Sequence, residues 1–97
     1  MNETEYLLTC LAEESAEVVQ AATKALRFGA DGICPDGQTN IARIIAELND
    51  VLAVIDLLEY REVIKRGSIG DYDQIDEKKK KVLHYMKIAR DNGTLQD

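Results

Sequence analysis

Between residues 41 and 58, apolar side chains recur at helical spacing on two sides of the chain, and this pattern restricts the possible folds most. The main stripe consists of Ile41, Ile44, Ile45, Leu48, Leu52 and Ile55. A second, offset stripe consists of Val51, Val54 and Leu58. Thr39 or Asn40 is expected to cap this helix. A helix that is apolar on two sides has to be covered on both. It is therefore expected to lie centrally, between another helix and a further surface.

The segment before it is also predicted to be a helix, from about Glu3 to Phe28. Its apolar residues define one face: Leu7, Leu11, Val18, Ala22 and Ala25. Gly29 is expected to end this helix, because glycine is favoured just past a helix C-terminus. Residues 29–38 contain three glycines and the single proline of the chain. They are therefore predicted to form a loop.

A third helix is expected after a turn at residues 67–72. Asp73 and Asp76 favour its start, because negative charge stabilises a helix N-terminus. Four residues mark the face that is expected to be buried: Ile75, Val82, Met86 and Ala89. Residues 94–97 are expected to form a tail, and no segment alternates apolar and polar residues as a strand does. The sequence therefore predicts an all-α fold, a long helical hairpin plus a third helix, in a single domain of residues 1–97.

Length and charge limit the partners. A chain of 97 residues buries a small core on its own, so a second subunit is one candidate for the further surface on the second helix. The net charge of −6, without a basic face, argues against a nucleic acid polymer as partner. No apolar run approaches the roughly 20 residues that span a bilayer. The N-terminus lacks a signal-peptide pattern, so a cytoplasmic location is expected, with Cys10 and Cys34 as free thiols.

Each of the first two predicted helices carries a pair of carboxylates one turn apart. Glu14 and Glu17 lie on the first, and Glu47 and Asp50 on the second. Glu14 falls on the apolar face of its helix, and Glu47 lies beside the second apolar stripe. An ionised carboxylate in such surroundings is costly unless it is paired or bound to a metal, and grouped carboxylates repel one another. A divalent cation would remove both costs, and all-oxygen ligands favour Mg²⁺ or Mn²⁺ over zinc.

A simpler explanation is that these carboxylates are solvated. Glutamates are common on helix surfaces, and a pair three residues apart is weak evidence by itself. Solvated carboxylates would lie opposite the apolar stripes, which accounts for four others: Glu3, Glu5, Glu59 and Glu62. Glu14 does not fit that explanation, so metal ligation is favoured for the two pairs.

These residues also resemble a known family. The letters EESAE at 13–17, followed by ELND at 47–50, resemble the EExxE…ExxD signature of the MazG-like all-α nucleoside triphosphate pyrophosphohydrolases. The flanking words AEVVQAATKALRFG and ELNDVLAVIDLL resemble small phage and bacterial members. The resemblance spans about residues 8–58, and the third helix matches only as a generic amphipathic helix. The 29 residues between Glu17 and Glu47 are at the long end for the family, and the loop is expected to absorb the excess.

The resemblance implies a MazG-like helical bundle completed by oligomerisation, as a dimer or a dimer of dimers. It implies hydrolysis between the α- and β-phosphates of a nucleoside triphosphate, which releases a monophosphate and pyrophosphate. The implied Mg²⁺ ligands are Glu14, Glu17, Glu47 and Asp50, with Mn²⁺ as a possible substitute. The metal would position the triphosphate and acidify an attacking water. Glu13 would either bind a further ion or act as general base, and both roles stay open.

Cationic and polar residues suggest where the substrate would bind. Lys24 lies two turns after Glu17, about 10 Å along the same edge, where it could reach phosphates held by the metal. Arg27 is a second candidate, rotated further towards the polar side. Both could instead complement the dipole at the helix C-terminus. Gln20 and Asn49 are candidates for contacts with a base edge, although Gln20 is also explained as a polar surface residue.

The function expected from the sequence is therefore Mg²⁺-dependent pyrophosphohydrolysis of a nucleoside triphosphate, with a purine deoxynucleotide such as dGTP favoured by the phage-like character. Glu13, Glu14 and Lys24 would take part in catalysis. The alternative is a non-catalytic helical interaction or regulatory module that uses the same apolar stripes. A carboxylate-bridged di-iron protein is disfavoured, because that site needs Glu-x-x-His motifs from two helices and His84 is the only histidine.

Overall fold

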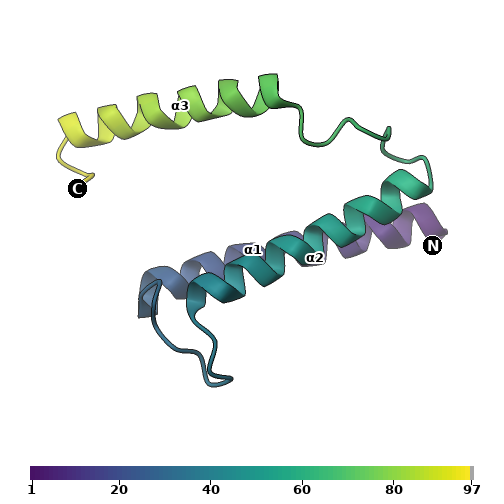
Figure 1. Ribbon diagram of the computed structural model, residues 1–97, viewed down its shortest axis with the longest axis horizontal. Coiled ribbons are helices and arrows are strands. Elements are labelled where there is room, and N and C mark those ends of the chain that lie inside the picture. The colour runs from purple at the N-terminus through teal and green to yellow at the C-terminus, as the bar shows by residue number, and fades with distance from the viewer. Residues whose placement is uncertain (97) are drawn as a thin grey trace. The chain divides into compact units, whose positions relative to one another are not determined.

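The computed structural model describes residues 1–96, over which it has three α-helices and no strand beyond an isolated bridge between Ile33 and Thr39 (Figure 1). The helices are α1 (Glu3–Phe28), α2 (Asn40–Tyr60) and α3 (Tyr72–Asp91). The predicted all-α class is confirmed. Asp97, the last residue of the expected tail, lies outside the described residues. The chain divides into two compact units, Met1–Arg66 and Gly67–Asp97.

Local hydrogen bonds set the bounds of α1. The Asn2 side chain accepts a hydrogen bond from the Glu5 backbone N–H at 2.8 Å, and the Glu5 carboxylate accepts one from the Asn2 N–H at 3.5 Å. This reciprocal pair satisfies backbone donors that the first turn leaves without partners. At the other end, Gly29 adopts a φ of 90°, which glycine reaches without a steric penalty. The predicted bounds of the first helix are confirmed.

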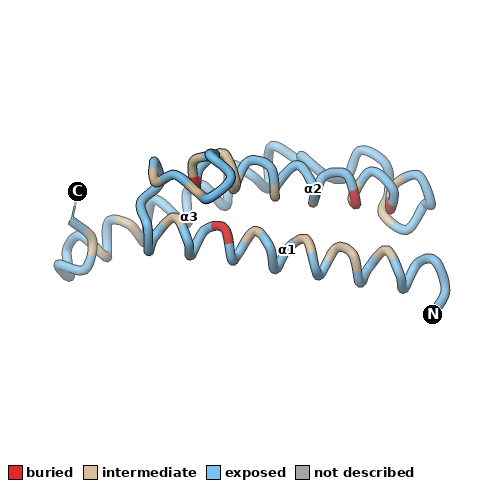
Figure 2. Tube along the Cα trace, turned by 90° about the horizontal axis from the view of Figure 1, so that it is seen from below, coloured by how far each residue is buried: buried red, intermediate tan, exposed pale blue. Residues whose placement is uncertain are grey.

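α1 and α2 run antiparallel and pack side by side as a hairpin (Figure 1). Thr39 caps α2, because its hydroxyl accepts a hydrogen bond from the Ala42 backbone N–H at 3.0 Å. Val54 and Leu58, from the offset stripe of α2, are buried, and so is Ala21 of α1 (Figure 2). The offset stripe is thus the side of α2 that packs in the hairpin.

The main stripe of α2 has a different environment. Four of its residues are between 42% and 55% exposed: Ile41, Ile45, Leu48 and Leu52. Ile44 and Ile55, at the border of the two stripes, are half-buried. One side of α2 is therefore covered by α1, as the two-sided pattern predicted, and the other side faces outwards.

One position on the predicted face of α1 is wrong. Ala22 is exposed, and its neighbour Ala21 is buried instead. A helix turns by about 100° per residue, so residues three, four and seven positions after Val18 all lie near its face. Ala21 and Ala22 therefore lie on opposite sides of Val18, about 60° one way and about 40° the other. The buried face of α1 extends to the Ala21 side. The other four predicted positions are half-buried: Leu7, Leu11, Val18 and Ala25.

The loop between α1 and α2 is fastened to the start of α2. The buried Asn40 donates a hydrogen bond from Nδ2 to the Gly29 carbonyl oxygen at 2.8 Å and accepts one from the Cys34 thiol at 3.2 Å. The backbone N–H of Ile41 donates to the Ala30 carbonyl oxygen at 3.0 Å. These contacts tie both halves of the loop to α2 and give the loop a defined position beside the hairpin.

The second unit contains α3. Asp71 caps it, and its carboxylate accepts hydrogen bonds from the backbone N–H groups of Asp73 and Gln74. No residue of α3 is buried, so the predicted buried face is wrong: Ile75 and Val82 are exposed, and Met86 and Ala89 are half-buried. A unit that contains one helix offers no second element against which to bury a face.

Among the described residues, no helix is both long enough and apolar enough to cross a membrane.

Candidate metal centre

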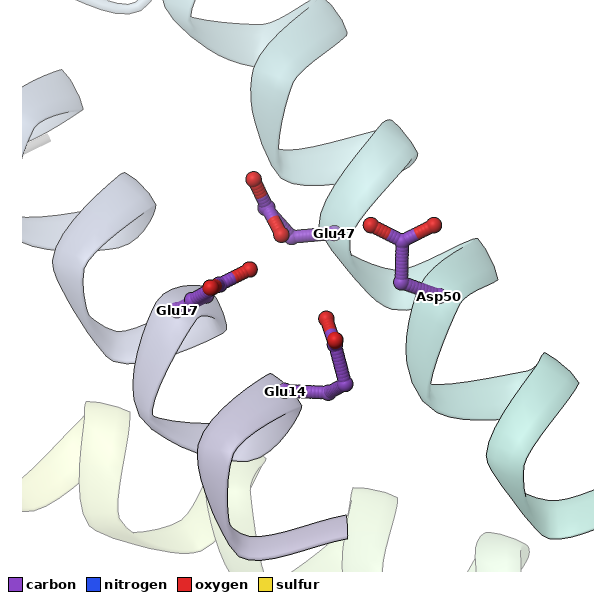
Figure 3. Close-up of side chains that lie close together, drawn as sticks. All are labelled: Glu14, Glu17, Glu47 and Asp50. Atoms are coloured by element: carbon purple, nitrogen blue, oxygen red, sulfur yellow. The ribbon is translucent and has the colours of Figure 1, made fainter. Parts of the chain in front are cut away.

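The antiparallel packing of α1 and α2 brings the two carboxylate pairs together. Glu14 and Glu17 project from α1 towards Glu47 and Asp50 of α2 (Figure 3). One carboxylate oxygen from each residue lies within 4.8 Å of the corresponding oxygen of the other three. The sequence predicted each pair from its spacing, and the hairpin places the pairs opposite each other.

The two inner carboxylates carry oxygens without partners. Glu14 and Glu47 are half-buried, whereas Glu17 and Asp50 are exposed. The Oε2 atoms of Glu14 and Glu47 are buried and have no hydrogen-bond partner. Burying an anionic oxygen without a protein donor costs free energy. A positive charge bound between the carboxylates would therefore stabilise the site.

The pKa values of the inner carboxyl groups reflect this crowding. Burial raises the pKa of Glu14 above its ordinary value of 4.5, and the negative charges of Glu17 and Asp50 raise it further. A hydrogen bond with the Glu17 carboxyl group, followed by burial, raises the pKa of Glu47. All three interactions favour the protonated form. Burial disfavours the charged form, protonation relieves the repulsion between carboxylates, and the hydrogen bond between two carboxyl groups requires a proton.

The same pKa shifts predict how the stability of the metal-free protein depends on pH. Because the folded-state pKa values lie above the unfolded value, this contribution to stability is fully present below pH 4.5 and is lost as the pH rises through the folded values. In EDTA, the melting temperature of the wild type is expected to fall as the pH rises above 4.5, relative to a Glu14→Gln, Glu47→Gln double variant. Saturating Mg²⁺ should reverse the trend, because the metal binds the ionised form. Parallel pH profiles for wild type and variant in EDTA would contradict this prediction.

The residues present fit a hard divalent cation. All four donors are carboxylate oxygens, the ligand type that Mg²⁺ and Mn²⁺ prefer. The two buried oxygens without partners are the atoms that a cation would satisfy. Glu13 is exposed and lies outside the group of four, although its charge contributes to the raised pKa of Glu14. Its predicted role, as a further ligand or as a general base, stays a prediction.

A cavity of about 660 Å³ adjoins the carboxylates, and Glu17 and Glu47 form part of its wall. Its walls come from α1, from α2 and from the loop between them. Apolar surface is supplied by Phe28, Ile33 and Pro35. This volume lies within the range of about 300–1,000 Å³ that is typical of small-molecule sites. The hairpin therefore provides a cavity beside the carboxylates that is large enough for a small molecule.

The predicted substrate-binding residues divide into two groups. Lys24 and Gln20 line the cavity. Arg27 and Asn49 are exposed and are not among the lining residues. The guanidinium of Arg27 lies 4.9 Å from the centroid of the Phe28 ring. The geometry therefore places Lys24 and Gln20 with the candidate site and leaves Arg27 and Asn49 beside it.

Sequence reasoning missed two parts of the cavity wall. Arg43 contributes a second cation, and the loop contributes Ile33, Cys34 and Pro35. A sequence signal for Arg43 existed, because it lies one turn before Glu47 and so shares its helix face. No comparable signal existed for the loop, because its position depends on hydrogen bonds such as those of Asn40.

No known protein family, curated protein sequence or solved structure matches this chain. The function therefore has to be inferred from the chemistry of the site.

Proposed function

We propose that this chain is a MazG-like all-α nucleoside triphosphate pyrophosphohydrolase, which converts a (d)NTP and water to a (d)NMP and pyrophosphate. Four residues would hold Mg²⁺, or Mn²⁺ as a substitute: Glu14, Glu17, Glu47 and Asp50. The observation that carries this proposal is the convergence of these carboxylates beside a cavity, with two buried oxygens that lack any partner. Without a bound cation, the repulsion between these four carboxylates would only destabilise the hairpin.

The bound cation and the residues of the cavity would have different roles in the reaction. When bound, the divalent cation supplies Lewis acidity towards phosphate oxygens and water. Lys24, in the cavity wall, offers an ammonium group to the phosphates, and Gln20 offers an amide to a base edge. The ring of Phe28 provides an apolar surface for the base. Glu13 either binds a further ion or accepts a proton from the attacking water.

The assembly is part of the proposal. The exposed stripe of Ile41, Ile45, Leu48 and Leu52 repeats at intervals of four, three and four residues, which is the spacing of a helix–helix contact. A second copy of the chain would cover it, in a dimer or a dimer of dimers working in the cytoplasm of a bacterium or of a phage-infected cell. Sedimentation velocity tests this, since a monomer at micromolar concentration would contradict it.

The reaction is tested by incubating the purified protein with each common NTP and dNTP, in Mg²⁺ and in EDTA. We expect release of nucleoside monophosphate and pyrophosphate in equal amounts, in Mg²⁺ only, with a purine deoxynucleotide such as dGTP among the best substrates. Release of inorganic phosphate in place of pyrophosphate would contradict the proposed bond cleavage. The ranking of the nucleotides would identify the preferred base and sugar.

A folded and assembled protein that releases no product from any nucleotide would refute the enzymatic proposal. The non-catalytic interaction module would then be favoured, because the same apolar stripe of α2 could bind a partner helix. The effect of Mg²⁺ on the melting temperature distinguishes the enzyme from the interaction module. A metal that binds only the folded state raises the melting temperature, by an amount that grows with its concentration. A pure interaction module is expected to show no such rise.

A further inference from the structure

Arg43 occupies an unusual position in the cavity wall. Its guanidinium Nη2 donates a hydrogen bond to Oδ2 of Asp36, in the loop between α1 and α2. The side chains are 39% and 45% exposed, so water reaches both partners. Ion pairs with this much exposure contribute little net stability, so little free energy opposes their separation. Arg43 is therefore held by Asp36 but remains available to a competing anion.

The direction of the two helices places Arg43 relative to the carboxylates. Arg43 lies four residues before Glu47 on α2, one turn or about 6 Å along the axis. Lys24 lies two turns after Glu17 on α1, about 10 Å along that axis. Because the helices are antiparallel, both cations lie on the loop side of the carboxylates. An anion that extends from the candidate metal centre into the cavity would meet Arg43 first and then Lys24.

The chemistry of arginine suits this place. A guanidinium presents donors in a planar fork, which matches the oxygens of a phosphate and forms two parallel hydrogen bonds. A carboxylate such as that of Asp36 binds the same fork, but it carries less charge than a triphosphate. The phosphates of a nucleotide can therefore replace Asp36 on Arg43.

We propose that Arg43 is a phosphate-binding residue of the cavity and that Asp36 holds its guanidinium in a resting position until a phosphate displaces the carboxylate. This inference rests on the proposed function, because the anion in question is the triphosphate of the substrate. Asp36 then acts as an internal competitor. The Asp36 carboxylate keeps singly charged anions from binding to Arg43, and it weakens the binding of the substrate by a modest factor.

A purely structural role for the ion pair makes a different prediction. If the pair served only to hold the loop, removing either partner would loosen the cavity in the same way. The loop has other attachments, however, including the hydrogen bond from Asn40 to Gly29 and that from the Cys34 N–H to the Gln38 carbonyl oxygen at 2.7 Å. The loop is therefore expected to keep its position when the pair is broken.

The test compares Arg43→Gln with Asp36→Asn. Asparagine keeps the acceptor oxygen that receives a hydrogen bond from the Gln38 N–H at 3.0 Å, and it removes the charge. Arg43→Gln is expected to raise KM for the nucleotide about tenfold or more, since a charge-assisted hydrogen bond to phosphate is lost. Asp36→Asn is expected to lower KM about two- to fivefold, since a competing carboxylate is lost. Equal shifts in the same direction would overturn the proposal and support a structural role.

A matched ion pair at the other end of the hairpin serves as control. The Arg61 guanidinium donates to the Glu3 carboxylate, and both side chains are at least half exposed. Neither residue lines the cavity. Arg61→Gln and Glu3→Gln are expected to leave KM unchanged. Thermal unfolding of all four variants identifies any loss of folded protein.

Binding of inorganic tripolyphosphate, measured by calorimetry in Mg²⁺, separates this inference from the proposed function. If the wild type is active and Arg43→Gln has an unchanged KM, the inference fails and the function stands. If no nucleotide is hydrolysed but tripolyphosphate binds at least tenfold more weakly to Arg43→Gln, the function fails and Arg43 stands as an anion-binding residue. A wild type that neither hydrolyses nucleotides nor binds tripolyphosphate would overturn both.

Discussion

Replacing Glu47 with glutamine is expected to lower Mg²⁺-dependent pyrophosphohydrolysis by more than about 100-fold, since changes to residues that only support metal ligands already cost 10–100-fold. The amide keeps the shape of the side chain and removes its charge. Glu47 is half-buried in the candidate site, a hydrogen bond with the Glu17 carboxyl group raises its pKa, and its buried Oε2 has no hydrogen-bond partner. A neutral amide cannot offer that oxygen as an anionic ligand.

The same substitution is expected to stabilise the metal-free protein. A hydrogen bond with the Glu17 carboxyl group and burial raise the pKa of Glu47, and repulsion from the carboxylates of Glu17, Asp50 and Glu14 raises it further. Glutamine removes that repulsion. The melting temperature in EDTA should therefore rise, while the increase on adding Mg²⁺ should largely disappear. Opposite changes in activity and in metal-free stability are typical of residues that are kept for function at the expense of the fold.

Kinetic assays and thermal unfolding with and without Mg²⁺ measure both effects of Glu47→Gln. Asp56→Asn is the matched control, because Asp56 is an exposed carboxylate on the same helix and lies outside the cluster. It is expected to change neither activity nor the response to Mg²⁺. A Glu47→Gln protein that retained full activity and the full Mg²⁺ response would refute the metal centre.

Leu58→Ala is expected to have the largest effect on stability, a loss of about 2–5 kcal/mol in the free energy of unfolding. Leu58 is 0% exposed, which makes it the most completely buried large side chain described in the hairpin. Its backbone carbonyl oxygen also accepts hydrogen bonds from the N–H groups of Val63 and Ile64, at the end of α2. Truncation leaves a cavity at a point where few other side chains are buried.

Urea denaturation measures this loss, with the slope of the transition checked for constancy. Leu57→Ala is the control, because Leu57 is the adjacent residue on the same helix and is 50% exposed. It is expected to cost less than about 1 kcal/mol, in line with substitutions at the surface. Equal losses for the two variants would contradict the packing described for α2 and would place Leu57 in an interface.

The helix ends illustrate what could be predicted from the sequence alone. Asn2, Thr39 and Gly29 act through hydrogen bonds or dihedral angles within a few residues of themselves. Signals of this range are present in the order of residues and need no tertiary structure. The carboxylate pairs belong to the same class, because residues three positions apart share a face of any helix.

The features that the sequence did not predict depend on contacts between distant parts of the chain. The exposed apolar residues of α3, such as Ile75 and Val82, follow the same periodicity as a buried face. Periodicity predicts which side of a helix could be covered, and it does not identify what covers it. Arg43 was overlooked for a related reason, because its significance depends on a cavity that is closed by a loop from another part of the chain.

The order of residues was enough to predict the three helices, the loop between the first two, and a pair of carboxylates one turn apart on each of these two helices. These properties depend on interactions between residues a few positions apart. The folded hairpin was needed to show that the offset stripe of α2 packs against α1 and that Glu14 and Glu47 have buried oxygens without hydrogen-bond partners. It was also needed to show that Lys24 and Arg43 line one cavity. Those features depend on how two helices are rotated about their own axes when they pack, which residues far apart in the chain decide together.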